Sequence, residues 1–193
     1  MLPFSSDTGA AVMRRVPRPE RERPTGTSTP NLWAPSGPTA ALLRGLSDRL
    51  GLGWSLNGAS RPDLLVLTNL GRGDPARLIA RCRPRRTVLC LDDKAGRAAL
   101  ARTALPCFTY SEGRDEADLT ARDLRSRPDG LAFLAVTRRE LTRVTVPPDD
   151  LYAALAALAC AAALGVPLSA AGQALSALLC AAGKTPSGSQ KTL

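Results

Sequence analysis

The side chains best suited to chemistry directly follow two short apolar runs of the sequence. They are Thr68, Asn69, Asp92 and Asp93. The runs, residues 64–67 and 87–91, are rich in Leu and Val, which is typical of buried strands. Ligands of parallel sheets bind outside the carboxyl ends of the strands. Hydroxyl, amide and carboxylate groups at those ends could therefore contact a nucleotide. The alternative is that these residues cap turns, a role that suits Asn and Asp.

The elements that would position these side chains alternate between strand and helix. The sequence predicts parallel strands at residues 64–68, 88–91 and 108–110, and helices at residues 39–50, 75–81 and 94–103. Gly51 suits the C-cap of the first helix. The alternation predicts an α/β fold with three layers and a mostly parallel sheet.

The pattern changes in the second half of the chain. Residues 119–125 alternate only loosely, and the turn signal Pro128-Asp129-Gly130 precedes two β-runs at residues 131–137 and 141–146. These runs predict an antiparallel hairpin at one edge of the sheet. Two helices follow at residues 151–164 and 169–182, with Asp150 as N-cap of the first, and both should pack on one face.

Composition divides the chain into three parts. Residues 1–37 are rich in Pro, Arg, Ser, Thr and Gly, which predicts a disordered basic leader that is dispensable for folding. Residues 38–182 are expected to form the α/β domain. Residues 183–193 are expected to form a flexible tail.

A net charge of +9 raises the question of a nucleic-acid partner. Arginines occur in the leader and around one turn, at Arg81, Arg83, Arg85 and Arg86. Aromatic residues that would stack on bases do not interleave with them. A solvated basic surface explains the pattern better, so nucleic acid is not expected as a partner.

Other residue types narrow the class of protein. The five cysteines are not spaced for a metal site, and the chain has no histidine. An odd number of cysteines without a secretory leader favours a cytoplasmic location. The longest apolar run, residues 151–164, is too short to span a membrane. The acidic cluster of Asp115, Glu116 and Asp118 is expected to be solvated.

Seven segments follow one another in an informative order: TNLGR at residues 68–72, LDD at 91–93, FTY at 108–110, ADLTARD at 117–123, PDG at 128–130, DLYAALAA at 150–157 and LGVP at 164–167. In this order they resemble the central, ATP-binding domain of the Mur ligases. The branch that it resembles most is UDP-N-acetylmuramoyl-tripeptide synthetase. The resemblance covers residues 63–178 and implies a degenerate and truncated relative.

The resemblance implies a site for ATP and Mg²⁺, which that family uses to join an amino acid to a nucleotide-linked peptide. Residues 24–31, PTGTSTPN, are similar to the family's phosphate loop, TGTNGKT. The implied nucleotide-binding residues are Thr25, Gly26, Thr27, Thr68, Asn69, Asp92, Asp93 and Tyr152. Asp74 is the implied ligand of Mg²⁺, a cation that prefers oxygen.

Several departures from the family pattern argue against this chemistry. In the candidate loop Thr29 replaces a glycine and Pro30 replaces the lysine, so a positive charge and an N–H group are lost. The family's GRDH reads Gly71-Arg72-Gly73-Asp74, and an Asn of its NVYNA motif is Ala153. No third domain, which would bind the incoming amino acid, is recognised. ATP and Mg²⁺ are expected to bind weakly or not at all.

Three functions remain open. We expect a non-catalytic Mur-ligase-like protein of bacterial peptidoglycan synthesis, which binds another cell-wall protein or a second copy of itself through the edge near Asp150, Tyr152 and the tail. The second is an ATP-dependent amino-acid ligase, or its ATP-binding fragment, acting on a UDP-N-acetylmuramoyl peptide. The third is a basic nucleic-acid-associated protein. Losing the lysine removes charge that stabilises phosphoryl transfer, so no catalytic residue is assigned.

Overall fold

The computed structural model describes residues 29–58, 61–68 and 74–182, and eight strands in this part of the chain form one sheet. The strands are β1 (Asn31–Trp33), β2 (Ser55–Leu56), β3 (Leu64–Leu67), β4 (Arg86–Cys90), β5 (Cys107–Ser111), β6 (Leu119–Arg127), β7 (Gly130–Thr137) and β8 (Leu141–Val146). Their spatial order is β2-β1-β3-β4-β5-β6-β7-β8.

All neighbours from β2 to β6 pair in parallel, and β7 and β8 add two antiparallel strands at one edge. This confirms the predicted mostly parallel sheet with an antiparallel edge hairpin. The turn from β6 to β7 ends at Gly130, whose φ of 139° and close approach to the Val146 carbonyl exclude a Cβ. Helices supply the crossover connections from β1 to β2, from β3 to β4 and from β4 to β5, whereas residues 112–118 join the parallel strands β5 and β6 without a helix.

The helices are α1 (Pro38–Leu50), α2 (Pro75–Cys82), α3 (Lys94–Arg102), α4 (Leu151–Ala163) and α5 (Leu168–Ala182), with a short 3₁₀ turn, η1 (Pro148–Asp150), before α4. All five α-helices were predicted, with boundaries that differ by no more than one residue. Gly51 caps α1 in the left-handed conformation, as predicted. In the described residues no helix combines the length and apolarity needed to cross a bilayer.

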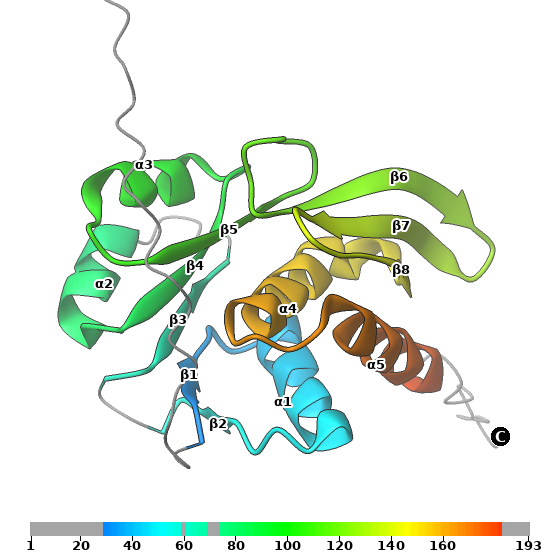
Figure 1. The fold of residues 1–193 in the computed structure, drawn as a ribbon, viewed down its shortest axis with the longest axis horizontal. Coiled ribbons are helices and arrows are strands. Elements are labelled where there is room, and N and C mark those ends of the chain that lie inside the picture. The colour runs from blue at the N-terminus through cyan, green and yellow to red at the C-terminus, as the bar shows by residue number, and fades with distance from the viewer. Residues whose placement is uncertain (1–28, 59–60, 69–73, 183–193) are drawn as a thin grey trace, which may run out of the picture.

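The helices form the two outer layers, with α2 and α3 on one face of the sheet and α1, α4 and α5 on the other (Figure 1). Leu64 and Val66 of β3 face the larger core, which includes residues of α1, α4 and α5. Leu65 and Leu67 of the same strand face a smaller core with α2 and α3. A strand that is buried on both faces has a continuous apolar sequence, which explains the run in β3. The three-layer α/β prediction is confirmed.

The sequence analysis missed β1 and β2. Residues 31–33 fall inside the predicted disordered leader, yet Leu32 pairs with Leu64 and is completely buried. The Asn31 N–H donates to the Asp63 carboxylate at 3.0 Å, and the Asp63 N–H donates to the Asn31 carbonyl at 2.8 Å. Three residues are too few to show an alternating pattern. Residues 1–28 and 183–193, the rest of the predicted leader and the tail, lie outside the described residues.

Two local predictions need correction. Asp150 is the N-cap residue of α4, but its side chain makes no capping hydrogen bond, because the 3₁₀ turn already precedes the helix. The loose alternation of residues 119–125 reflects a strand with a bulge. The register of β6 against β7 shifts between Arg122 and Arg125, and Asp123 lies at a φ of 51°.

Candidate functional site

The candidate side chains gather at the carboxyl ends of β3, β4 and β5. Because these strands are parallel, Thr68, Asp92 and Ser111 come to one edge of the sheet. The same edge holds the N-termini of α2 and α3, where Asp74 and Asp93 lie. We call this region the carboxyl edge. Of the other predicted site residues, Thr25, Gly26, Thr27 and Asn69 lie outside the described residues.

Asp92 joins the end of β4 to the loop that follows β5. One of its carboxylate oxygens accepts from the Ser111 hydroxyl at 2.5 Å, and the other accepts from the Glu112 N–H at 2.7 Å. Ser111 Oγ in turn accepts from the N–H groups of Gly113 and Arg114, at 3.1 and 2.9 Å. Asp92 therefore already has two internal donors, and the loop is held in one conformation.

Glu112 connects this loop to Tyr152 on α4. The Tyr152 hydroxyl donates to Glu112 Oε2 at 3.0 Å, although 41% of the Tyr152 surface is exposed. Partial burial, followed by the hydrogen bond to Glu112 and the charge of Asp92, raises the pKa of the Tyr152 phenol. The phenol therefore stays protonated at neutral pH. Sequence analysis missed Ser111 and Glu112, although they follow the third parallel strand as Asp92 follows the second.

Asp93 and Asp74 both cap helices. Asp93 accepts from the Ala95 N–H at 3.1 Å, and Asp74 accepts from the Ala76 N–H at 2.9 Å. Asp74 also forms an exposed ion pair with Arg77 at 3.8 Å. A capping carboxylate satisfies an N–H group that the first helical turn leaves free, and is worth about 1 kcal/mol. The turn-capping interpretation thus holds for Asp93, and Asp74, which was expected as a Mg²⁺ ligand, also acts as a cap.

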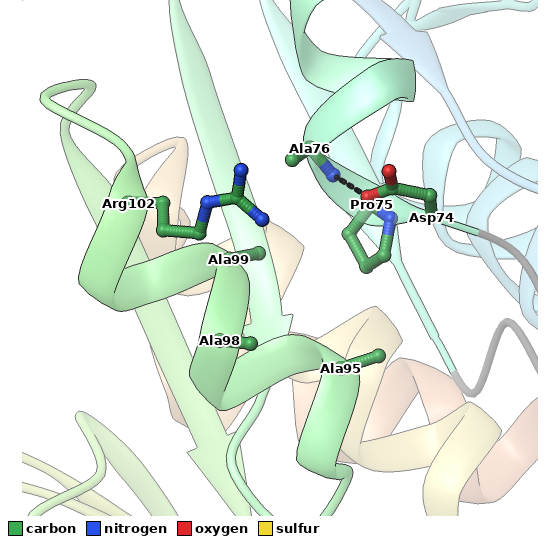
Figure 2. Close-up of a pocket in the computed structure, with 7 residues that line it drawn as sticks. All are labelled: Asp74, Pro75, Ala76, Ala95, Ala98, Ala99 and Arg102. Atoms are coloured by element: carbon green, nitrogen blue, oxygen red, sulfur yellow. Dashed lines mark hydrogen bonds between the residues drawn. The ribbon is translucent and has the colours of Figure 1, made fainter.

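A small pocket of about 270 Å³ lies between α2 and α3, beside Asp74. Its lining residues are Asp74, Pro75, Ala76, Ala95, Ala98, Ala99 and Arg102. Figure 2 shows Arg102 extending from α3 toward Ala76, while Ala95, Ala98 and Ala99 line the pocket wall along the same helix. The wall consists mainly of methyl groups, and the Asp74 oxygen that faces Ala76 is occupied by its N–H. The pocket thus offers Arg102 as its main polar feature.

The connection from β1 to α1, residues 34–37, runs from a strand to the start of a helix, as a phosphate loop does. Such a loop follows a strand and ends in Gly-Lys-Ser/Thr at the start of a helix, where N–H groups surround the phosphates. Here the helix opens with Gly37-Pro38-Thr39, so proline stands in the lysine position. The sequence analysis did not recognise this loop, because it did not predict β1.

This loop is also poor in hydrogen-bond donors. Pro35 and Pro38 have no N–H group. The N–H of Ala34 donates to the Asn57 side chain at 3.0 Å. This leaves Ser36 and Gly37 as the residues of 34–38 whose N–H groups are neither missing nor bonded to Asn57. The residues present therefore do not fit the phosphates of ATP.

Of the stretch that sequence analysis compared with a phosphate loop, residues 24–28 lie outside the described residues, and residues 29 and 30 lead into β1. Pro30, the lysine position of that stretch, lies at the amino end of β1, where its carbonyl accepts from the Ser55 N–H at 3.1 Å. In a parallel sheet this end is opposite to Thr68 and Asp92. The similarity of residues 25–30 to the family loop thus does not give Pro30 the position of a phosphate loop.

The acidic cluster forms local pairs. Asp115 pairs with Arg122, and Glu116 pairs with Arg114 at 3.2 Å. Asp118 accepts from the N–H and hydroxyl of Thr109, at 3.0 and 3.1 Å. Within the described ranges, no three cysteine, aspartate or glutamate side chains gather in a way that could hold a metal ion.

Comparison with known proteins gives a likeness of fold. No protein-family model matches the sequence, and a search of the curated proteins finds no match. MurF from Acinetobacter baumannii matches with a TM-score of 0.60 and 16% identity, over 76% of this chain and 44% of that one. A UDP-N-acetylmuramoyl-L-alanyl-D-glutamate–2,6-diaminopimelate ligase matches with a TM-score of 0.59 and 15% identity, over 76% and 45% of the two chains.

MurF from Thermotoga maritima, solved in complex with ADP, matches with a TM-score of 0.55 and 14% identity, over 86% of this chain and 49% of that one. This chain therefore has the fold of part of the Mur ligases and spans less than half the length of these three chains. The matches include ligases of several kinds, so they do not single out the tripeptide-forming branch.

Proposed function

We propose that this chain is a non-catalytic Mur-ligase-like protein that serves as a scaffold or binding partner in cytoplasmic peptidoglycan synthesis. The fold supports the link to Mur ligases. One observation carries the proposal that catalysis is lost: Pro38 stands where a phosphate loop has its lysine, at the start of α1.

Catalysis of phosphoryl transfer depends on charge and N–H groups that are held in place before the reaction. Removing even one such donor typically costs about 3 kcal/mol of transition-state stabilisation. At Pro38 both the charge and the N–H are missing, and Pro35 and Ala34 remove two further donors from the same turn. Losses of this size leave little rate enhancement, so the fold must serve another purpose.

The carboxyl edge supports the same conclusion. Asp92 is bonded to Ser111 and Glu112, and Tyr152 to Glu112. These residues stabilise the edge without a ligand, since their polar atoms have internal partners. The non-catalytic interpretation therefore explains these side chains by their internal hydrogen bonds. A nucleotide would have to compete with these bonds in order to bind.

Calorimetric titration of the full chain with Mg·ATP tests the proposal. We expect no binding at submillimolar nucleotide. The substitution Pro38→Lys restores the charge and the N–H at the start of α1, and we expect it to produce measurable binding. Pro128→Lys is the matched control, because it adds the same charge at the exposed hairpin turn. It should leave the chain without nucleotide affinity.

Two outcomes would overturn the proposal. Submillimolar binding by the unchanged chain would favour the second function, an ATP-dependent ligase or its ATP-binding fragment, which is compatible with the same fold. Equal gains from Pro38→Lys and Pro128→Lys would show that charge alone attracts the nucleotide, and that residues 34–37 are not a degenerate phosphate loop.

A scaffold must act through a surface, and sedimentation tests this part of the proposal. The large apolar side chains that are exposed in the described residues are Leu141, at 64%, and Tyr152, at 41%. Tyr152 belongs to the edge that was expected to bind a partner. We expect a homodimer, or a complex with another cell-wall synthesis protein. A monomer that sediments alone, both when pure and in cell extract, would contradict the scaffold role.

A further inference from the structure

The amino ends of β3 and β4 gather arginines that the sequence spreads over 26 positions, from Arg61 to Arg86. The Arg85 N–H donates to the Pro62 carbonyl at 3.2 Å, so the segment before β4 runs directly beside the segment before β3. Arg81 lies in the last turn of α2, and Arg83 is the residue that caps its end. Five exposed arginines meet here: Arg61, Arg81, Arg83, Arg85 and Arg86. We call them the amino-edge arginines.

Only part of this cluster has a structural explanation. Arg86 donates to the Ala163 carbonyl at the end of α4, at 3.1 Å, and Arg85 pairs with Asp63 at 3.5 Å. Arg81 is favourable near the negative end of the α2 dipole. No ion pair within the described residues engages Arg61, Arg81 or Arg83. The cluster thus carries more positive charge than local stability requires.

We propose that the amino-edge arginines form a surface that binds the phosphate backbone of nucleic acid without reading its sequence. Guanidinium groups bind phosphates with paired hydrogen bonds, and binding to a backbone requires no apolar contact. Protein interfaces, by contrast, rely on buried aromatic or aliphatic anchors. The large exposed apolar residues of the described part, Leu141 and Tyr152, belong to β8 and to the carboxyl edge, away from this cluster.

The sequence places four of the amino-edge arginines around one turn, at residues 81–86, and the pairing of β3 with β4 brings Arg61 beside them. Aromatic side chains still do not accompany them, so stacking on bases is not part of the interaction. The surface therefore contacts phosphates alone, and its affinity does not depend on whether the chain binds ATP.

Fluorescence anisotropy with a short labelled DNA duplex tests the surface, using the full chain. At physiological salt we expect a Kd between about 10⁻⁶ and 10⁻⁴ M, the range of non-specific binding. The triple substitution Arg61→Gln, Arg81→Gln and Arg83→Gln removes the arginines that have no ion pair. It should weaken binding by about tenfold and reduce the slope of log K against log salt by about 2 to 3.

The matched control removes the same charge elsewhere. Arg138, Arg139 and Arg143 are also exposed, on the β7–β8 turn and on β8. Replacing these three by Gln should change the affinity by no more than about twofold. Both variants keep the basic N-terminal residues, so the difference between them reports on position alone. Circular dichroism checks the fold, and the double variant Arg61→Gln and Arg81→Gln replaces the triple one if Arg83→Gln disturbs the cap.

Three results would overturn the proposal. Equal losses in the two triple variants would mean that net charge alone attracts the duplex. No loss in the first variant would place the binding elsewhere. Tighter binding to polyglutamate, or to vesicles of phosphatidylglycerol and phosphatidylcholine, than to the duplex would identify an acidic protein or a membrane surface as the partner instead.

Discussion

Charged side chains at the two ends of the same parallel strands differ in whether they have bonded partners. At the carboxyl edge, Asp74, Asp92 and Asp93 all accept hydrogen bonds from nearby N–H or hydroxyl groups. At the amino edge, Arg61 and Arg83 project into solvent without an ion pair among the described residues. The carboxylates therefore complete the local structure, whereas these arginines do not.

Helix direction explains part of this difference between the two edges. The N-termini of α2 and α3 lie at the carboxyl edge and favour acidic residues, and the C-terminus of α2 lies at the amino edge and favours basic ones. The dipoles account for Asp74, Asp93 and Arg81. They do not account for Arg61 or Arg85, which flank strands. In this molecule, the charges that complete the local structure are recognisable by their bonded partners.

The largest effect is expected from Gly96→Ala, at the carboxyl edge. A Cβ at position 96 would lie 2.1 Å from the Cys90 carbonyl oxygen, so α3 would have to move away from β4. We expect a loss of about 3 kcal/mol in the free energy of unfolding, measured by urea denaturation. Gly113→Ala, with no atom within 4 Å of the new Cβ, is the control. A tolerated Gly96→Ala would show that the carboxyl edge is not closely packed.

Asp92→Ala should rank second. It removes two acceptors, so the Ser111 hydroxyl and the Glu112 N–H lose their partner and the β5–β6 loop loosens. We expect a loss of about 2 kcal/mol in the free energy of unfolding. Arg83→Gln at the opposite edge should stay within about 0.5 kcal/mol. Equal losses in the two variants would remove the distinction between the edges.

A smaller effect is expected within the amino edge itself. Arg86→Gln removes the hydrogen bond to the Ala163 carbonyl, which ends α4 without another basic residue in its last turn. We expect a loss of about 1 kcal/mol by thermal denaturation. Arg85→Gln removes an ion pair in which 85% of the arginine side chain is exposed, and should cost less than about 0.5 kcal/mol. The reverse ranking would show that Arg85 has the structural role.

The smallest effect on the free energy of unfolding at neutral pH is expected from the ionisation of the two tyrosines of the chain. Burial within the larger core, beside Cys90 and Cys160, raises the pKa of Tyr110. Partial burial and the hydrogen bond to Glu112 raise the pKa of Tyr152. A pKa that is raised by folding contributes stability below the unfolded value of about 10, and this stability is lost as the pH rises further. We expect unfolding free energy to be unaffected by these groups at neutral pH and to fall above about pH 10.

Absorbance of tyrosinate checks this expectation. The folded chain should show little tyrosinate at pH values where free tyrosine is half ionised, and Tyr152→Phe should remove only the part that comes from the carboxyl edge. Ordinary ionisation of both phenols in the folded chain would contradict the described environment of Tyr152 and its bond to Glu112.

Short-range patterns predicted much of the fold. The apolar runs of β3 and β4 are continuous because both strands are buried on both faces, and Gly51 directly follows α1 as its cap. The candidate site was predicted less completely. Glu112 and Tyr152 are 40 residues apart, and nothing in either segment alone indicates their hydrogen bond.

The sequence by itself determined the α/β class, the order of β3 to β5 with their helices, and the C-cap of α1, because burial and capping leave periodic or adjacent signals. The tertiary structure decided the rest. Three residues become β1 only by pairing with β3, and this pairing makes residues 34–37 a strand-to-helix loop that lacks a lysine. The same sheet brings Arg61 beside Arg85. Contacts between distant segments form only when the whole sheet is assembled, so no local pattern records them.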